Sequence, residues 1–127
     1  MKRIISMILS MTLILNGCGE TTVENTYQQI TQEEAKKMMD TQEVIILDVR
    51  EQNEFDAGHI PGSVLLPVGT ISAETAAAVI PELSSVVLVY CRSGNRSKTA
   101  SSTLVELGYT NICEFGGINT WPYEVEQ

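Results

Sequence analysis

The sequence predicts an α/β fold with a mainly parallel sheet. Two observations support this prediction: short, continuous apolar runs recur along the chain, as in strands buried on both faces, and helical patterns separate them. The clearest case is the apolar run at residues 86–90, which ends in Cys91 and precedes a helical pattern from Ser97 to Gly108. The apolar face of that helix holds Ala100, Leu104 and Leu107. A chain of 127 residues has the length of one domain.

The domain is expected to begin with an edge strand, a helix and a buried strand. Residues 27–30 form the candidate edge strand. Thr31 is the expected N-cap of the helix, and Glu34 is placed to reach back to it as in a capping box. Residues 44–47 are continuously apolar and predict a strand buried on both faces, which Asp48 follows directly.

Short elements alternate through the middle of the chain. Residues 51–57 predict a helical turn closed by Gly58, and residues 64–67 predict a short strand. Ser72 is placed to cap a helix over residues 73–80. This alternation extends the α/β pattern up to the apolar run that ends in Cys91.

The last strand is expected at residues 111–115, followed by a turn at Gly116 and Gly117 and by Trp121 packing back on the core. Cys113 lies within this strand. We interpret it as a buried, inert thiol; the alternative is a regulatory pair with Cys91, which an oxidising location would permit.

The N-terminus resembles a bacterial lipoprotein signal peptide. Lys2 and Arg3 give it a positive head, and residues 4–15 are nearly all apolar but too few to span a bilayer. The following Leu15-Asn16-Gly17-Cys18 resembles a lipobox, in which the cysteine is lipidated and becomes the first residue of the mature protein. The alternative is plain secretion with cleavage nearby.

This segment sets the expected domain organisation and location. Residues 1–17 are a signal peptide, residues 18–26 a flexible tether anchored through lipid on Cys18, and residues 27–127 the folded domain. The protein is then expected in the cell envelope, as a periplasmic or cell-surface lipoprotein attached to a membrane on its extracytoplasmic side.

The distribution of charge argues against nucleic acid as a partner and for a small anion. The formal net charge is −8, with eight basic and sixteen acidic residues. Apart from Lys2 and Arg3, half of the remaining basic residues are Arg92, Arg96 and Lys98, which lie close together after Cys91. The alternative is a chance cluster on a solvated face.

The short segment after Cys91 predicts a reactive thiol. A tight loop that leads from a strand into a helix can turn several backbone N–H groups inward, and the helix N-terminus adds to their positive potential. Such a cradle stabilises a thiolate, which is the nucleophilic form of cysteine. The alternative is an inert cysteine buried at the end of a core strand.

Three upstream residues have both a structural and a functional interpretation. Asp48 is either an acceptor that shapes the Cys91 loop or pairs with one of its arginines, or a cap on the next short helix. Arg50 is interpreted as a salt-bridge strut rather than a substrate ligand. His59, the single histidine, could pair with Cys91 in catalysis, but its Pro/Gly-containing turn favours a structural role. No metal site or cofactor is expected, because one histidine and scattered cysteines lack ligand spacing.

With these motifs in place, the region from Tyr27 to Glu126 resembles a single-domain rhodanese, a member of the rhodanese-like sulfurtransferase family. The resemblance depends on blocks in a fixed order: Leu47-Asp48-Val49-Arg50-Glu51 with Glu54-Phe55, Gly58-His59-Ile60-Pro61-Gly62-Ser63, Cys91-Arg92-Ser93-Gly94-Asn95-Arg96-Ser97, and the weaker Phe115-Gly116-Gly117 with Trp121.

The resemblance implies a three-layer α/β/α fold with a five-stranded sheet, and a persulfide on Cys91. It implies that the residues after Cys91 hold the sulfur donor and the persulfide; these are Arg92, Ser93, Gly94, Asn95, Arg96 and Ser97. The pattern Cys-Arg-x-Gly-x-Arg is associated with thiosulfate as the donor, and the acceptor would be cyanide or a thiol. Asp48, Arg50 and His59 match positions that the family uses chiefly for structure.

Three alternative functions are compatible with parts of the same sequence pattern. Related phosphatases have five residues between the catalytic cysteine and an arginine (Cys-x5-Arg), and their loop surrounds a phosphoryl group. Here only four residues separate Cys91 from Arg96. The shorter loop leaves a smaller anion site, which suits a single sulfur atom better than a phosphoryl group. A non-catalytic binding module is a second rival, although Cys91 is present. A carrier that delivers persulfide sulfur to a partner protein at the membrane surface is a third. The sequence leaves the oligomeric state open.

Overall fold

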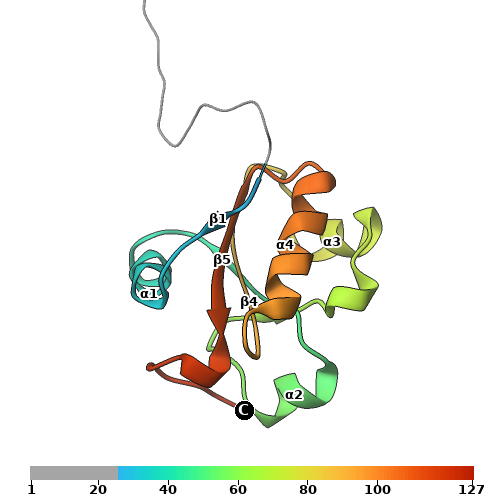
Figure 1. Ribbon diagram of the computed structural model, residues 1–127. Coiled ribbons are helices and arrows are strands. Elements are labelled where there is room, and N and C mark those ends of the chain that lie inside the picture. Colours follow the sequence, from blue (N-terminus) through green and yellow to red (C-terminus); the bar gives the residue numbers. More distant parts are fainter. Residues whose placement is uncertain (1–25) are drawn as a thin grey trace, which may run out of the picture.

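The computed structural model describes residues 26–127, which form a five-stranded sheet in the order β1-β5-β4-β2-β3 with every pair parallel (Figure 1). The strands are β1 (Gln28–Gln29), β2 (Ile45–Asp48), β3 (Val64–Leu65), β4 (Val86–Cys91) and β5 (Asn111–Gly117). The helices are α1 (Gln32–Thr41), α2 (Gln52–Ala57), α3 (Ala73–Val79) and α4 (Asn95–Glu106), with 3-10 turns η2 (Val68–Thr70) and η3 (Ile118–Thr120). The expected α/β class is confirmed.

The N-terminal predictions lie outside the described residues. They comprise the signal peptide at residues 1–17, the lipidated Cys18 and the tether up to residue 25. Among the helices of residues 26–127, none has the length and apolar character needed to cross a membrane.

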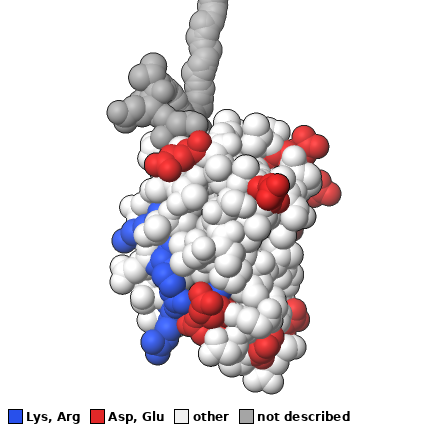
Figure 2. Space-filling view, turned by 90° about the vertical axis from the view of Figure 1, so that its right-hand side faces the viewer, with Lys and Arg blue, Asp and Glu red and all other residues white. Residues whose placement is uncertain are grey.

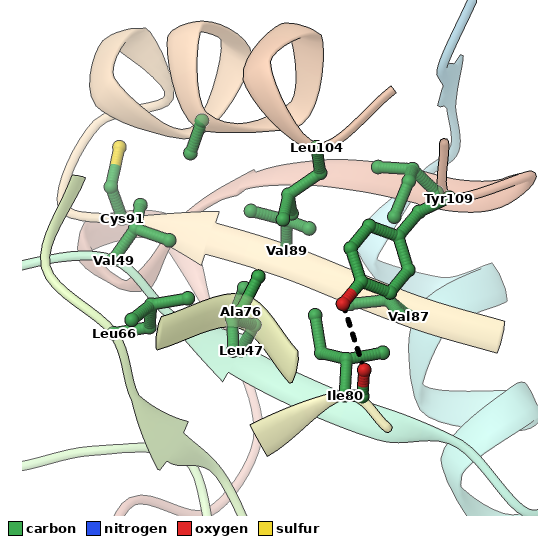
Figure 3. Close-up of a cluster of buried hydrophobic side chains, with 12 residues drawn as sticks. Leu47, Val49, Leu66, Ala76, Ile80, Val87, Val89, Cys91, Leu104 and Tyr109 are labelled. Carbon is green, nitrogen blue, oxygen red and sulfur yellow. Dashed lines mark hydrogen bonds between the residues drawn. The ribbon is translucent and has the colours of Figure 1, made fainter. Parts of the chain in front are cut away.

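Helices cover both faces of the sheet, which gives the three expected layers. Figure 1 shows α1 on one side and α3 and α4 on the other. Ala35 of α1 packs in a buried cluster with Leu88 of β4, whereas Ala100 and Leu104 of α4 pack with Val89 in a second cluster (Figure 3). The sheet therefore separates two hydrophobic cores, and β4, at its centre, is buried by both.

The alternation of side chains along β4 decides how the two described cysteines relate. Val89 and Cys91 belong to the cluster under α3 and α4, whereas Leu88 belongs to the cluster under α1. Cys113 is the partner of Leu88 in the β4–β5 register and belongs to the same cluster as Leu88. Cys91 and Cys113 thus face opposite sides of the sheet, and no disulfide joins them. The alternative of a Cys91–Cys113 pair is contradicted, and the burial of Cys113 is confirmed.

Most predicted helix ends are confirmed. Thr31 and Glu34 form the expected capping box on α1, and Ser72 caps α3. Gly58 follows α2 as its C-cap. Trp121 is buried against the core under α1, as expected. These local signals work because each residue satisfies backbone groups that a helix end leaves unpaired.

Two boundaries near Cys91 differ from the predictions. The helix begins at Asn95 rather than Ser97, because Gly94 adopts a left-handed conformation (φ +105°) and serves as its N-cap. Gly116 and Gly117 do not form a turn after the last strand but belong to β5, where the β4–β5 register shifts between Val89 and Cys91. The loop after Cys91 is therefore shorter than expected, and β5 runs alongside it.

A buried ion pair supports the carboxyl ends of β2 and β4. Arg50 Nη2 lies 2.7 Å from Asp48 Oδ2, and the same nitrogen donates to the Gly58 carbonyl oxygen at 2.7 Å. The Tyr90 hydroxyl donates to Asp48 Oδ2 at 2.7 Å, and burial together with this carboxylate raises the pKa of Tyr90. Asp48 neither caps α2, whose N-cap is Glu51, nor pairs with an arginine of the Cys91 loop. It instead fixes Arg50 and Tyr90, the residue before Cys91.

A second ion pair fastens α2 to the first turn of α4. Arg96 donates two hydrogen bonds to the carboxylate of Glu54, at 2.8 and 3.0 Å. The bond from Arg96 is the largest influence on Glu54 and lowers the pKa of its carboxyl from 4.5 to about 2. Paired N–H···O bonds of this kind fix geometry as well as charge. We call Arg96 and Glu54 the clasp, because together they hold α2 against the start of the helix that follows the Cys91 loop.

The clasp predicts an acid-dependent contribution to stability. Because folding lowers the pKa of Glu54, its contribution is fully present above pH 4.5 and is lost as the pH falls toward about 2. We expect Glu54→Gln to lower the urea midpoint at pH 7 and to differ much less from wild type near pH 2.5. Glu43→Gln, at the amino end of β2, controls for the loss of one negative charge. An equal difference at both pH values would contradict this prediction.

Candidate functional site

The candidate site is the turn between β4 and α4. Cys91 is the last residue of β4, and only residues 92–94 separate it from Asn95, the first residue of α4. The left-handed Gly94 reverses the chain so that the helix starts directly above the strand end. The first-turn amides of α4, which have no partner within the helix, are thereby aimed at the cysteine.

These amides bind the Cys91 sulfur. The backbone N–H groups of Gly94 and Ser97 donate to Cys91 Sγ at distances of 3.1 and 3.3 Å. The sulfur also lies 3.5 Å from the Ser97 hydroxyl oxygen, to which the thiol can donate. Cys91 is 1% exposed, yet its sulfur points toward α4 and away from the neighbouring Val49 and Leu66 (Figure 3). The interpretation of Cys91 as an inert core cysteine does not fit this hydrogen-bonded position.

The cradle makes the thiol more acidic despite its burial. Burial is the largest single influence and by itself raises the pKa of Cys91. The hydrogen bond between the sulfur and the Ser97 side chain opposes it, as do the hydrogen bonds from the amides of Ser97, Gly94 and Ser93, and together they bring the pKa below its ordinary value of 9.0. The site therefore favours negative charge on sulfur, as the nucleophilic form of cysteine requires.

Strand β5 closes one side of the loop. A Cβ atom on Gly117 would lie 2.0 Å from the Arg92 carbonyl oxygen and 2.6 Å from the Ser93 nitrogen, so no side chain fits at this position. The Asn119 amide donates to the same Arg92 oxygen at 3.1 Å. The loop thus rests directly on the backbone at the end of β5, which limits how far it can expand.

The three cations near Cys91 do not have equal roles. Arg92 and Lys98 are exposed, whereas the guanidinium of Arg96 is bound to Glu54 in the clasp. The Glu54 hydrogen bond is the main cause that raises the pKa of Arg96, and the charge of Cys91 adds to it. In Figure 2 the positive side chains of the face shown form one run, and acidic side chains lie beside its lower end. Arg96 thus differs from Arg92 and Lys98 in having a carboxylate partner, and its contact with an anionic donor stays a prediction.

His59 does not join the candidate site. Its Nδ1 lies 2.9 Å from the Phe55 carbonyl oxygen, and its Nε2 lies 3.5 Å from a carboxylate oxygen of Glu126. The imidazole also stacks on the Phe55 ring, with 3.8 Å between the ring centroids. Both ring nitrogens contact groups other than Cys91, so the Cys–His alternative is contradicted and the structural interpretation holds.

Two acidic residues near the site were not predicted. Glu54 reaches Arg96 from α2, and Glu114 of β5 is 2% exposed and accepts a hydrogen bond from the Ser97 hydroxyl. The signal for Glu114 was an acid placed within the apolar run of residues 112–115. Within residues 26–127, no group of three or more His, Cys, Asp or Glu residues is arranged to hold a metal ion.

The arrangement suits a covalent step on sulfur. A thiol with lowered pKa can attack, and donors fixed around Sγ stabilise the negative charge that Sγ carries as a nucleophile or as a leaving group. Ser97 and Gly94 come from one rigid helix start, so the donors need little reorganisation during the reaction.

Comparisons with known proteins agree with this geometry. The model of the rhodanese-like domain matches residues 31–123. Thiosulfate sulfurtransferase GlpE of Pseudoalteromonas translucida is 30% identical over 96 residues, which is 75% of this chain and 89% of that protein. The adenylyltransferase and sulfurtransferase UBA4 of Meyerozyma guilliermondii is 33% identical over 89 residues, 65% of this chain but only 21% of that longer protein.

A solved structure gives the same result. The structure described as rhodanese with anions from E. coli matches with a TM-score of 0.62 and 27% sequence identity, covering 67% of this chain and 99% of that one. The family match spans most of the described residues and includes the whole turn between β4 and α4. The chain belongs to the rhodanese-like domain family.

Proposed function

We propose that this chain is a sulfurtransferase that takes a sulfane sulfur from thiosulfate onto Cys91 and passes it to cyanide or a thiol. The observation that carries the proposal is the convergence of the Gly94 and Ser97 amides on Cys91 Sγ, at 3.1 and 3.3 Å. Thiosulfate as the donor is supported by the name of the GlpE relative, which is 30% identical to this chain.

The proposed reaction has two covalent halves. In the first, the Cys91 thiolate attacks the outer sulfur of thiosulfate; a new S–S bond forms, the S–S bond of thiosulfate breaks, and its electron pair leaves with sulfite. In the second, the acceptor attacks the outer sulfur of the persulfide, and the Cys91 thiolate is the leaving group. Both halves conserve charge, and a covalent intermediate of this kind gives ping-pong kinetics.

The amides around Sγ have a role in each half. They stabilise the attacking thiolate in the first half and the leaving thiolate in the second. The persulfide also carries the transferable sulfur about 2 Å beyond Sγ, toward an acceptor. A carrier role, with a protein thiol as the acceptor, uses the same persulfide and differs only in the second half.

The exposed cations supply the charge that a dianionic donor needs. Arg92 and Lys98 are exposed near the loop, whereas Arg96 is held in the clasp. We assign donor attraction to Arg92 and Lys98, and the positioning of the first turn of α4 to Arg96.

A lipid anchor on Cys18 completes the proposal and rests on the sequence motif Leu15-Asn16-Gly17-Cys18. When the full chain is produced in a bacterium supplied with a clickable fatty acid, we expect the protein to be labelled and to sediment with membranes. Cys18→Ser should lose both properties, whereas Cys113→Ser should keep them. Unlabelled wild-type protein in the soluble fraction would contradict the anchor.

Sulfur loading tests the catalytic proposal directly. Incubation with thiosulfate should add one sulfur atom to the peptide that contains Cys91 and none to the peptide that contains Cys113, as read by mass spectrometry. Cys91→Ser should abolish both this adduct and the formation of thiocyanate from thiosulfate and cyanide. Cys113→Ser is the matched control and should retain activity. Full activity in a folded Cys91→Ser variant would remove the proposal.

Charge substitutions test the assignment of the cations. Arg92→Ala should raise KM for thiosulfate about two- to fivefold, which corresponds to an exposed charge pair of roughly 0.5–1 kcal/mol. Its melting temperature should stay close to that of wild type, because the Arg92 side chain is exposed. Lys37→Ala, on the exposed side of α1, controls for the loss of one positive charge. An unchanged KM in Arg92→Ala would exclude this arginine from donor attraction.

A further inference from the structure

A buried carboxylate lies one side chain away from the Cys91 sulfur. Glu114 in β5 is 2% exposed. Its Oε2 accepts hydrogen bonds from the Ser97 hydroxyl at 2.5 Å and from the Gly116 amide at 3.0 Å, and its Oε1 accepts one from Gln29 Nε2 at 3.3 Å. Among the residues that the structure describes, no lysine or arginine forms an ion pair with Glu114. A buried carboxylate without a cationic partner is costly and needs an explanation.

The shortest hydrogen bond of the Ser97 hydroxyl is the one to Glu114, and the Gly116 carbonyl oxygen lies farther away, at 3.5 Å. The Ser97 hydroxyl has one proton, and the short bond to Glu114 uses it. The lone pairs of the same oxygen therefore face Cys91, whose thiol donates to it across 3.5 Å. The chain runs from the Cys91 thiol through the Ser97 hydroxyl to the Glu114 carboxylate.

We propose that Cys91 and Glu114 share one proton through Ser97, so that Glu114 becomes protonated when the thiolate forms. In this step the S–H bond breaks as a proton moves to Ser97 Oγ, and the original Ser97 O–H bond breaks as its proton moves to Glu114 Oε2. One negative charge passes from the carboxylate to the sulfur, and no proton leaves the site. Ser97 then donates to the thiolate and accepts from the carboxylic acid.

The transfer would help the proposed reaction, on which this inference rests. Thiosulfate is a dianion, and a neutral Glu114 removes a negative charge that would otherwise repel it. The thiol and the carboxylate are linked through a single hydroxyl, so a proton that leaves the sulfur has a direct route to the carboxylate. Glu114 does not touch the reacting sulfur; it acts through Ser97 and is a positioning residue.

Few other charges face this pair. Lys98 of α4 is the only other charged residue that lines the open hollow of about 320 Å³ beside Glu114. From β1 and the start of α1, the hollow receives the uncharged amides Gln29 and Gln32. On the side of Cys91, Arg96 contributes its positive charge from the clasp. None of these groups can accept the thiol proton in place of Glu114, because the lysine and arginine are cations and the amides are not bases.

The pH dependence of Cys91 alkylation tests the shared proton without any sulfur donor. We would treat the full chain with iodoacetamide and follow the Cys91 peptide by mass spectrometry, which separates it from Cys113. The wild-type rate should rise in two steps with pH, one for each proton lost by the pair. Glu114→Gln, which preserves shape, should show a single step whose midpoint lies about one pH unit or more below the second wild-type step. Glu43→Gln should retain the wild-type profile.

Ser97→Ala provides the opposite expectation. It removes the hydroxyl that donates to the thiolate but leaves the charge of Glu114, so the alkylation midpoint should rise. If Glu114 only supported the loop, both variants would loosen the cradle and move the midpoint upward. A single-step wild-type profile, or an upward shift in Glu114→Gln, overturns the shared proton even if sulfur loading succeeds. Conversely, failure of sulfur loading with the predicted alkylation profiles would overturn the proposed function alone.

Discussion

The arrangement of this protein depends on backbone N–H groups that converge on one sulfur atom. Burial of Cys91 opposes ionisation, and the amides of Gly94 and Ser97 reverse that effect by donating to Sγ. These amides are available because they belong to a helix start, where no intrahelical acceptor exists. The left-handed Gly94 brings the helix close enough for its unpaired donors to reach the end of the strand.

The surrounding structure holds this turn from several directions. Asp48 fixes Tyr90 just before the cysteine, and the clasp fixes α4 just after it through Glu54. Gly117 lets the backbone of β5 lie against the loop itself. Three separate segments therefore support a turn of a few residues, so small changes in the position of the amides are resisted. Such preorganised donors stabilise charge without having to move during the reaction.

Much of the fold could be predicted from the sequence, because its signals are local. The apolar run of β2, the capping box at Thr31 and the cap at Ser72 each depend on neighbouring residues, and the structure confirms them. The start of α4 was misplaced because the effect of Gly94 depends on its backbone angle rather than on its identity alone. The partner of Arg96 was missed because α2 comes beside α4 only in the folded chain.

Glu114 is a second residue whose partners could not be predicted from the sequence. In the sequence it interrupts an apolar run, but its contacts come from β1 and α4, which the sequence cannot place beside it. The sequence also could not show that Cys91 and Cys113 face opposite sides of the sheet, because this depends on the register between β4 and β5. Local pattern therefore predicted the turn and its thiol, while the charges that act on them required the tertiary structure.

The missing side chain at Gly117 also limits how this protein could acquire a new substrate. On this side the Arg92 carbonyl already touches the backbone of β5. A longer turn that encircles a larger tetrahedral anion would therefore have to expand on the side facing away from β5. Even a Gly117→Ala substitution would force the loop to move, because the new methyl group would overlap the Arg92 carbonyl.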